Sequence, residues 1–569
     1  MMRETLTANR TVKQTDWNTV NWRCANRNVR RLRQRIFRAT QLGDWAKVQS
    51  LQRLMLRSYS NTLLSVRRVT QTNQGRTTPG VDKLVVKTPA ARSQLVDALM
   101  RYQPWRASPT RRVYIPKANG TQRPLGIPTI HDRCLQARVK NALEPCWEAQ
   151  FEGSSYGFRP GRGCHDAIVK IYELARPNKR KKWVVDADIK GAFDNIDHQF
   201  LLDTSGPCPG KELIKQWLKA GYVDGNVFHP TTTGTPQGGI ISPLLANIAL
   251  HGMEEALGVK HRKRGELRSS RAVVRYADDF VVFCESQSDA ERVQTQILPA
   301  WLQQRGLTLS TEKTRVVHLT DGFDFLGFNT RLYPTPNRTR TGYKLHIKPS
   351  KQTVAQIRQK LRDQWLRLRG TNLVAVLARL NPIIRGEAHY YRIADASKTF
   401  HALDNWMFHR ELRYVKHTHP YKSWAWQRSH YWGTLHRERR DHWVFGDRHT
   451  GGYLLKFSWF PSERHVLVKG TAAPDDPQLA TYWAARTERK AQNLPRRTKQ
   501  LAVQQKGVCP LCSMSLFNGE EVQIHHKKPR SAGGTDAARN CTLVHLYCQQ
   551  QIHSGKGTPR SASGEPLLL

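Results

Sequence analysis

The sequence predicts an α+β protein of several domains, and three observations lead to this class. At 569 residues the chain is too long for a single hydrophobic core. The tetrad Tyr276-Ala277-Asp278-Asp279 lies between two short apolar runs, residues 272–274 and 280–283, which predicts a β-hairpin with the acids at its tip. Apolar residues recur at helical spacing in basic segments, which predicts amphipathic helices.

The net charge indicates a polyanionic partner. The chain has 91 Lys and Arg residues against 45 Asp and Glu, for a net charge of +46. Such an excess is typical of nucleic-acid binding, which should weaken steeply as salt is added. No apolar run approaches the roughly 20 residues of a membrane-spanning helix, and the polar N-terminus lacks a signal-peptide core. We therefore expect a cytoplasmic protein with no membrane partner.

The adjacent acids Asp278 and Asp279 indicate a metal site. Successive strand residues face opposite ways, so two neighbouring carboxylates converge on one point only at a turn. Hard cations such as Mg²⁺ need this kind of oxygen cluster. Two such metals can activate a 3′-hydroxyl and stabilise a leaving pyrophosphate. The alternative is a solvated Asp-Asp turn.

A third acid comes from an upstream strand at about residues 182–188. Val184, Asp186 and Asp188 share one face of this strand, and a carboxylate leaving an apolar context needs a base or a metal as partner. Between the two acid sites lies Thr235-Pro236-Gln237-Gly238-Gly239, a turn whose glycines allow the backbone to approach a ligand closely.

In this order, the segments resemble the reverse transcriptases encoded by bacterial group II introns. Further matching motifs are Arg111-Arg112-Val113-Tyr114-Ile115-Pro116-Lys117, Arg123-Pro124-Leu125-Gly126-Ile127-Pro128, Ser155-Tyr156-Gly157-Phe158-Arg159, Leu307-Thr308-Leu309-Ser310-Thr311-Glu312-Lys313, Phe323-Asp324-Phe325-Leu326-Gly327 and Asn381-Pro382-Ile383-Ile384-Arg385-Gly386. The resemblance covers nearly the whole chain. It implies a right-hand polymerase with fingers, a palm built on an antiparallel sheet and a helical thumb.

The same resemblance divides the chain into five domains. They are a basic helical RNA-binding extension at 1–75, fingers and palm at 76–335, a thumb or maturase X domain at 336–419, a DNA-binding region at 420–500, and a zinc-containing ββα-metal HNH endonuclease module at 501–569. We expect the module's tail, from residue 555, to be disordered.

The resemblance assigns the polymerase residues. Asp188 and Asp278 would bind Mg²⁺ with Asp279 as the third carboxylate, and Asp188 is preferred to Asp186 because an aromatic, Phe193, follows five positions later. Phe193 would sit under the incoming sugar and select deoxynucleotides; the alternative is simple core packing.

Cations near a predicted hairpin would contact the nucleotide. Lys117 and Arg123 flank a short turn and by resemblance bind the triphosphate, where arginine can bond bidentately and lysine acts as a point charge. Arg112 is a weaker candidate, and Gln237 would line the dNTP pocket. Lys313 and Gly327 have supporting roles.

Three regions look suited to nucleic acid. Residues 17–43 hold no acid and form a predicted helix with Val29, Leu32, Ile36 and Ala39 on its apolar face, beside Arg23, Arg27, Arg30, Arg31, Arg33, Arg35 and Arg38. By resemblance this helix grips template or intron RNA; the alternative is a solvated arginine face.

Residues 344–369 predict a second basic helix. The thumb motif has Glu387 where the family has tryptophan. In 420–500, tryptophans among arginines either stack on bases or fill a small core.

The last tenth of the chain carries a strong zinc signal. Cys509 and Cys512 form a CxxC knuckle, and His545 and Cys548 follow some thirty residues later. Four such ligands close a structural zinc site. Cys541 is the competing fourth ligand.

The His-His, Asn and His order resembles an HNH endonuclease. His526 would be the general base, His525 and His553 would ligate Mg²⁺, and Asn540 would fix the loop. Many relatives have histidine directly after the last cysteine, where this chain has Gln549, so a DNA-binding module without cleavage is the alternative.

Together these features predict an RNA-directed DNA polymerase that binds its intron RNA, assists splicing as a maturase and nicks target DNA to prime cDNA synthesis with dNTPs during retrohoming. Two rivals are a non-catalytic splicing factor and a domesticated host reverse transcriptase. The acid triad with Phe193, Lys117 and Arg123 opposes the first, and the nuclease-like module opposes the second.

Overall fold

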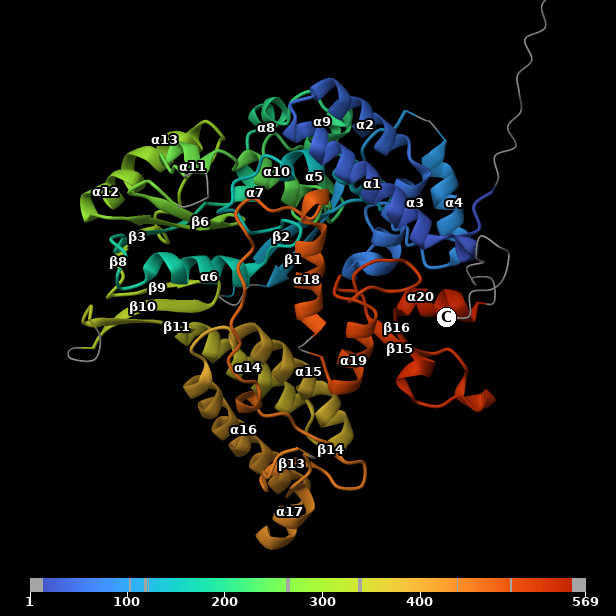
Figure 1. The fold of residues 1–569 in the computed structure, drawn as a ribbon, viewed down its shortest axis with the longest axis vertical. Coiled ribbons are helices and arrows are strands. Elements are labelled where there is room, and N and C mark those ends of the chain that lie inside the picture. Colours follow the sequence, from blue (N-terminus) through green and yellow to red (C-terminus); the bar gives the residue numbers. More distant parts are fainter. Residues whose placement is uncertain are drawn as a thin grey trace, which may run out of the picture.

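The computed structural model describes residues 14–101, 104–116, 120, 122–261, 267–335, 340–436, 438–491 and 494–554. The predicted nucleotide contact Lys117, the polar N-terminus and the predicted tail from residue 555 lie outside this part of the chain. Figure 1 shows helices and sheets of the first two thirds forming the upper body, a helical bundle below, and the C-terminal elements beside the N-terminal helices.

The N-terminal extension is a helical layer. Its helices are α1 (Trp22–Gln41), α2 (Trp45–Arg57) and α3 (Tyr59–Arg67), and the helices α4 (Pro89–Met100) and α5 (Ile130–Glu148), which follow it in the chain, pack against this layer. The predicted basic helix is confirmed, because α1 buries Val29, Ile36 and Ala39. Asn21 begins α1 by accepting a hydrogen bond from the backbone of Cys24. Arg33 departs from the predicted nucleic-acid face, since it forms ion pairs with Glu144 and Asp475 inside the protein.

A small sheet forms the fingers. Its strands β1 (Thr110–Pro116), β2 (Gln122–Ile127), β4 (Tyr222–Asp224) and β5 (Val227–His229) lie in the order β2-β1-β4-β5. The predicted hairpin is confirmed, because β1 and β2 pair antiparallel with Pro116 opposite Gln122.

The palm is a four-stranded antiparallel sheet in the order β6-β7-β3-β8. Its strands are β3 (Trp183–Asp188), β6 (Ala272–Tyr276), β7 (Asp279–Cys284) and β8 (Arg315–His318). The helices around it are α6 (Cys164–Ala175), α7 (Ala192–Asn195), α8 (His198–Thr204), α9 (Lys211–Lys219), α10 (Ser242–Ala249), α11 (Met253–Ala256), α12 (Gln287–Arg292) and α13 (Leu298–Gln303).

Alternating palm side chains enter two different cores. Val281 and Phe283 of β7 pack with α6, whereas Phe280 and Val282 pack with α10 and α13. A strand buried on both faces reads as a continuous apolar run, which explains the two runs that flank the acid tetrad.

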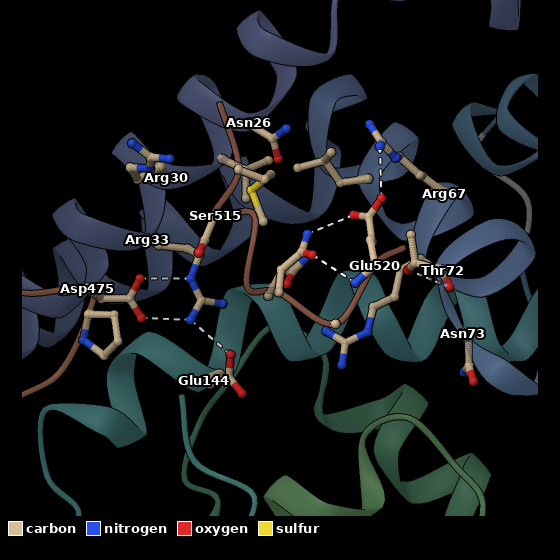
Figure 2. Close-up of a pocket in the computed structure, with 18 of the residues that line it drawn as sticks. Asn26, Arg30, Arg33, Arg67, Thr72, Asn73, Glu144, Asp475, Ser515 and Glu520 are labelled. Carbon is tan, nitrogen blue, oxygen red and sulfur yellow. Dashed lines mark hydrogen bonds and ion pairs between the residues drawn. The ribbon is translucent and has the colours of Figure 1, made fainter. Parts of the chain in front are cut away.

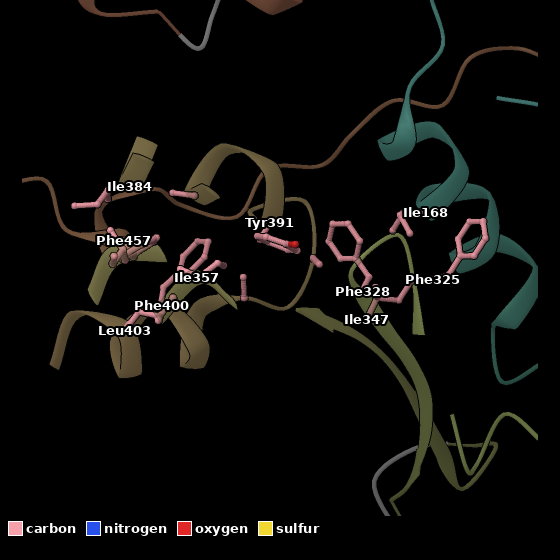
Figure 3. Close-up of a cluster of buried hydrophobic side chains, with 14 of the residues drawn as sticks. Ile168, Phe325, Phe328, Ile347, Ile357, Ile384, Tyr391, Phe400, Leu403 and Phe457 are labelled. Carbon is pink, nitrogen blue, oxygen red and sulfur yellow. The ribbon is translucent and has the colours of Figure 1, made fainter. Parts of the chain in front are cut away.

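The thumb follows a three-stranded sheet. Strands β9 (Phe323–Phe325), β10 (Phe328–Pro334) and β11 (Tyr343–Pro349) precede helices α14 (Lys351–Arg367), α15 (Leu373–Tyr391) and α16 (Ser397–Thr418). The predicted basic helix at 344–369 is therefore wrong over its first residues, which pair with β10, and correct from Lys351. Figure 3 shows the continuous core that joins Ile168 of α6 and Phe328 of β10 to the thumb helices.

Two questions that the sequence left open in and after the thumb now have a physical account. Glu387, where the family has tryptophan, accepts a hydrogen bond from Lys360 at 2.9 Å and so links α15 to α14. Trp432 is only 2% exposed and belongs to the thumb core, whereas Trp424 and Trp443 are 45% and 44% exposed. The elements here are α17 (Trp424–Tyr431), β12 (Trp432–Gly433), β13 (Val444–Asp447) and β14 (Gly452–Tyr453).

The C-terminal module lies against the N-terminal extension. After α18 (Ala480–Ala491) and α19 (Arg496–Gln504), it consists of β15 (Val522–His526), β16 (Cys541–His545) and α20 (Leu546–His553), which is a ββα arrangement. Figure 1 shows α20 beneath the N-terminal helices. Among the described helices, none has the length and apolar character needed to cross a membrane.

Candidate functional site

The palm sheet brings the predicted acids to one edge. Asp188 ends β3 and stands opposite Asp279, which begins β7. Asp278 occupies the turn between β6 and β7, and Tyr276 pairs with Asp279 to close that turn. Each acid therefore leaves an apolar strand at the same end of the sheet.

The turn that carries Asp278 is tight, and Gly157 and Arg275 hold its backbone in place. Ala277 adopts a left-handed backbone with φ of 60°. Gly157 passes so close that a Cβ there would lie 2.3 Å from the Ala277 nitrogen. The fully buried Arg275 donates from Nη1 to the Ala277 carbonyl and to Asn247 Oδ1, both at 3.2 Å. These contacts fix the direction in which Asp278 leaves the turn.

Electrostatics at this edge favour a cation. Burial, followed by the charges of Asp278 and Asp188, raises the pKa of Asp279 to about 7, and burial also raises the pKa of Asp278. Lys313 places its Nζ 2.7 Å from Asp188 Oδ2. Like charges held close are relieved by a divalent metal, so the donor set fits Mg²⁺. The three carboxylates are less compact than the C-terminal clusters described below, whose ligand atoms all lie within 4.8 Å of one another.

Asp186 is used differently from Asp188. Its Oδ2 accepts a hydrogen bond from Arg315 Nε at 3.2 Å, and it lies two residues farther from the turn, about 6.6 Å along the strand. The geometry therefore places Asp188, and not Asp186, beside Asp279.

Two of the predicted nucleotide residues, Arg123 and Gln237, join the fingers sheet to the 235–239 turn. Arg123 Nε donates to Gln237 Oε1 at 2.7 Å, and the Gln237 carbonyl accepts from the Gly126 backbone at 2.7 Å. This contact draws the residue 235–239 turn onto β2. Arg112 lies over the Tyr222 ring at 3.8 Å, which ties its guanidinium to the fingers sheet.

Phe193 is mostly enclosed. It is 6% exposed, packs in the core between α10 and the palm sheet, and meets Phe158 edge-on with ring centroids 6.2 Å apart. Its carbonyl accepts a hydrogen bond from Thr235 at 2.6 Å. Phe193 therefore packs in the core and also lies beside the 235–239 turn.

The C-terminal cysteines form a compact cluster. Cys509, Cys512, His545 and Cys548 are all buried, with ligand atoms within 4.8 Å of one another. Hydrogen bonding among the sulfurs lowers the pKa of Cys509 far below its ordinary value and raises that of Cys512, as expected where ligands crowd one position. The set fits a tetrahedral metal such as zinc. His545 is the fourth member of this cluster, whereas Cys541 lies in a different group with His526 and Asp536.

The nuclease-like residues surround a loop between β15 and β16. His526 Nε2 lies 2.7 Å from Asp536 Oδ1, and Arg530 holds the same carboxylate through both of its oxygens. Asn540 closes the loop through three hydrogen bonds, two with Lys528 and one with the Thr535 carbonyl.

Other module residues stand near this loop. The rings of His525 and His553 lie 5.7 Å apart and nearly perpendicular. Cys541 sits with His526 and Asp536 in a second cluster and accepts a hydrogen bond from Arg497. Gln549 keeps a buried side-chain oxygen without a hydrogen-bond partner.

Asp536 and Arg275 were not predicted from the sequence. Asp536 could have been found, because it is the one acid between Val522 and Ser554 and lies in a basic loop. Arg275 carries no such signal, since an arginine within an apolar strand indicates neither its burial nor its partner.

Comparison with known proteins agrees with this arrangement. Four family models match the chain: the N-terminal domain of reverse transcriptase at 17–99, reverse transcriptase (RNA-dependent DNA polymerase) at 115–330, the group II intron maturase-specific domain at 354–432, and HNH endonuclease at 509–555. This chain belongs to the group II intron reverse transcriptases that carry a maturase domain and an HNH endonuclease domain.

Curated relatives match about half of the chain. Protein YkfC of Escherichia coli is 33% identical over 332 residues, covering 50% of this chain and 85% of YkfC. Group II intron-encoded protein LtrA of Lactococcus lactis is 30% identical over 368 residues, covering 50% of this chain and 61% of LtrA. Among solved structures, telomerase from Candida albicans is 12% identical with a TM-score of 0.33, covering 57% of this chain and 61% of that chain.

Proposed function

We propose that this chain copies RNA into DNA at the palm edge, with Asp188, Asp278 and Asp279 as the Mg²⁺ ligands. The observation that best supports this proposal is that Asp188 of β3 lies opposite Asp279 of β7, with Asp278 on the adjoining turn. Bound Mg²⁺ would lower the pKa of the primer 3′-hydroxyl and would neutralise negative charge on the leaving pyrophosphate. Lys313, already 2.7 Å from Asp188, neutralises part of the acid charge until the metal arrives.

The fingers residues would position the incoming dNTP. Arg123 presents a guanidinium to the triphosphate, with Lys117 as a second cation, and Gln237 lines the pocket from the 235–239 turn. The Arg123 to Gln237 contact supports this role, because it holds the two side chains next to each other between β2 and the 235–239 turn. Phe193 would close the pocket beneath the sugar and disfavour a 2′-hydroxyl.

Intron RNA is the proposed macromolecular partner, bound through the N-terminal extension and the maturase thumb. The outer face of α1 carries the exposed residues Arg23, Arg27, Arg31, Arg35 and Arg38. Arginines on one helix face can follow a phosphate backbone, and a net charge of +46 supports binding of a large RNA. Holding that RNA in its folded form would assist splicing.

The C-terminal module would nick target DNA and so supply the primer. His526 would act as general base through Nδ1, because its Nε2 lies against Asp536. His525 and His553 would hold Mg²⁺, and Cys509, Cys512, His545 and Cys548 would hold a structural zinc ion. Gln549 stands where relatives carry histidine, so its amide oxygen would replace an imidazole at that place.

Primer extension on an RNA template with dNTPs and Mg²⁺ tests the polymerase. We expect Asp278→Ala to lose at least about 10³-fold in rate, the cost of several kcal/mol of metal stabilisation. Asp186→Asn is the control, because this acid lies on β3 with Asp188 but pairs with Arg315; we expect near-normal extension.

A chain that binds intron RNA tightly but extends no primer would contradict the polymerase and favour a non-catalytic splicing factor. An Asp186→Asn variant as inactive as Asp278→Ala would instead reject the assignment of Asp188.

A further inference from the structure

The two ends of the chain form one structural unit. The N-terminal extension and the C-terminal module share a single hydrophobic core, which includes Trp17, Trp22, Val66, Leu511, Leu516 and Leu543. Gln551 of α20 also donates hydrogen bonds to the carbonyls of Asn18 and Val20, both at 2.9 Å. The module is therefore packed onto the extension by apolar and polar contacts alike.

Arg67 is the residue that joins the extension to the cysteine cluster. Its Nη2 lies 3.4 Å from Cys548 Sγ and 3.2 Å from Glu520 Oε2. The guanidinium stands over the Trp22 ring at 4.7 Å, and the side chain is 6% exposed. Figure 2 shows Arg67 reaching Glu520 across the space between the two ends of the chain. A charge buried this deeply requires anionic partners, which here belong to the module.

The knuckle between the first two cysteines is also held by the extension. Asn26 of α1 donates to the Cys512 carbonyl at 2.8 Å, and Arg30 donates to the Ser513 carbonyl at 3.0 Å. The backbone that presents Cys512 is thus fixed by α1, while the sulfur of Cys548 is contacted from α3.

The charge of a loaded cluster explains why an arginine belongs there. Three thiolates and one neutral imidazole around a divalent zinc ion leave a net negative charge in a buried place. Outer-shell donors to metal ligands offset such charge and orient the ligands. We infer that Arg67 is the outer-shell partner of the Cys/His metal site and that metal loading of this site orders the N-terminal extension.

This inference rests on the proposed zinc site and extends it to a region remote in sequence. The four ligands and their contacts with Asn26, Arg30 and Arg67 come together only in this docked arrangement, so the free energy of metal binding is also free energy of folding for that arrangement. Binding energy that requires the docked arrangement stabilises both partners of that arrangement. Loss of metal should therefore loosen α1 and α3 as well as the module, and so affect the surface proposed to bind RNA.

Hydrogen exchange on the unaltered chain tests the coupling. We would measure the zinc content of the purified protein and then compare exchange with and without a zinc chelator. We expect about one zinc per chain, and faster exchange on chelation in α1 and α3 but not in α9, a palm-side helix outside the shared core. Zinc present with faster exchange confined to residues 505–554 would overturn the inference while keeping the metal site. Absence of zinc would reject the metal site itself.

Variants test the role of Arg67. Release of zinc to a chromogenic chelator should be about 10- to 100-fold faster in Arg67→Met, the usual effect of losing an outer-shell partner, and intermediate in Arg67→Lys. Arg68→Met is the matched control, because this neighbouring arginine is exposed and makes no contact with the cysteines among the described residues. Equal release from Arg67→Met and Arg68→Met would overturn the assignment. The chelation experiment needs no variant, so it decides the coupling even if Arg67→Met does not fold.

Discussion

Glu411 shows how one buried carboxyl can make thumb stability depend on pH. It is 7% exposed and accepts a hydrogen bond from Trp432 Nε1 at 3.0 Å. Burial raises its pKa from 4.5 to about 7. Below pH 4.5 the Glu411 carboxyl is protonated in both the folded and the unfolded chain. Between pH 4.5 and 7 it ionises in the unfolded chain but stays protonated in the folded chain, so the free energy of unfolding falls as pH rises.

We expect Glu411→Gln to stabilise the protein above pH 7 by on the order of 3 kcal/mol and to have little effect near pH 4.5. Glutamine keeps an oxygen that can accept from Trp432 but carries no charge. Thermal unfolding at pH 5 and pH 8 measures this difference. Glu438→Gln, at an exposed acid that follows Trp432 in the chain, is the control and should show no such pH dependence. An equal shift of Glu411→Gln at both pH values would contradict the explanation.

Single residues differ in how far their roles could be predicted. Asp188 and Asp279 were predictable, because strand patterns place a carboxylate at the end of an apolar run. The sequence left the fourth member of the cysteine cluster open between His545 and Cys541, and the folded chain places the His545 ring 3.3 Å from the Cys512 sulfur. Arg67 was not predictable, since its partners Glu520 and Cys548 are remote in sequence and become neighbours only through folding.

At the scale of elements, the hairpin β6–β7 depends on the close approach of Gly157. We expect Gly157→Ala to push the acid turn out of place, because the added Cβ would lie 2.3 Å from the Ala277 nitrogen, a backbone atom. A displacement of about 1 Å at reacting groups can cost about 10²-fold in rate. Primer extension should fall accordingly, while zinc content stays unchanged.

Gly163→Ala is the control for this prediction. An added Cβ at Gly163 meets no atom within 4 Å, and its φ of −150° suits alanine. We expect nearly normal extension by Gly163→Ala. Full activity of Gly157→Ala would show that the turn does not depend on this contact.

Helix α1 carries both exposed arginines, which are free to contact RNA, and one arginine that is paired inside the protein. Arg31 and Arg35 are exposed, whereas Arg33 is paired with Glu144 and Asp475. We expect Arg31→Gln and Arg35→Gln each to reduce the salt dependence of RNA binding by about one unit of the log–log slope. Arg33→Gln should lower thermal stability and leave that slope unchanged. A lower slope for Arg33→Gln in a fully folded protein would contradict this division.

The elements themselves were predicted where periodicity was strong. The acid hairpin, the β1–β2 hairpin and helix α1 follow their apolar patterns. The start of α14 was misplaced, because residues 343–349 are as basic as the helix that follows and only their pairing with β10 makes them a strand. Tryptophan content could not distinguish a base-stacking surface from a core, and Trp432 lies in the core.

At the scale of the whole molecule, the chain joins its first and last parts around the polymerase body. The segment after the thumb runs back toward the palm. Arg162, next to α6, donates hydrogen bonds to the carbonyls of Gly470 and Ala472 in this segment. Farther along it, Asp475 forms an ion pair with Arg33 of α1. Figure 1 shows this segment running from the thumb up to α18. The segment that leads to the nuclease-like module is therefore anchored to the palm side and to α1, and the module itself is packed on the extension, so it is not a freely tethered domain.

This placement suggests that the nick and the copying step are linked. We expect His526→Ala, which removes the proposed general base, to lose about 10²- to 10⁴-fold of DNA nicking and with it cDNA synthesis on an intact duplex that spans the intron's own insertion site. The polymerase residues are untouched, so a duplex nicked beforehand should restore cDNA synthesis. Sequencing-gel analysis of both duplexes, with intron RNA bound to the protein, measures the two steps separately.

If the polymerase site and the nuclease site are distinct, Asp278→Ala should give the opposite result to His526→Ala. It should nick the intact duplex and synthesise no cDNA from either the intact or the pre-nicked duplex. Synthesis by His526→Ala on the intact duplex would mean that the primer does not come from this module. Failure of the pre-nicked duplex to restore synthesis would mean that His526 also supports the fold, since Asp536 joins it to Arg497 and Arg530. Only restored synthesis supports a nuclease whose role in this chain is to supply the polymerase with its 3′ end.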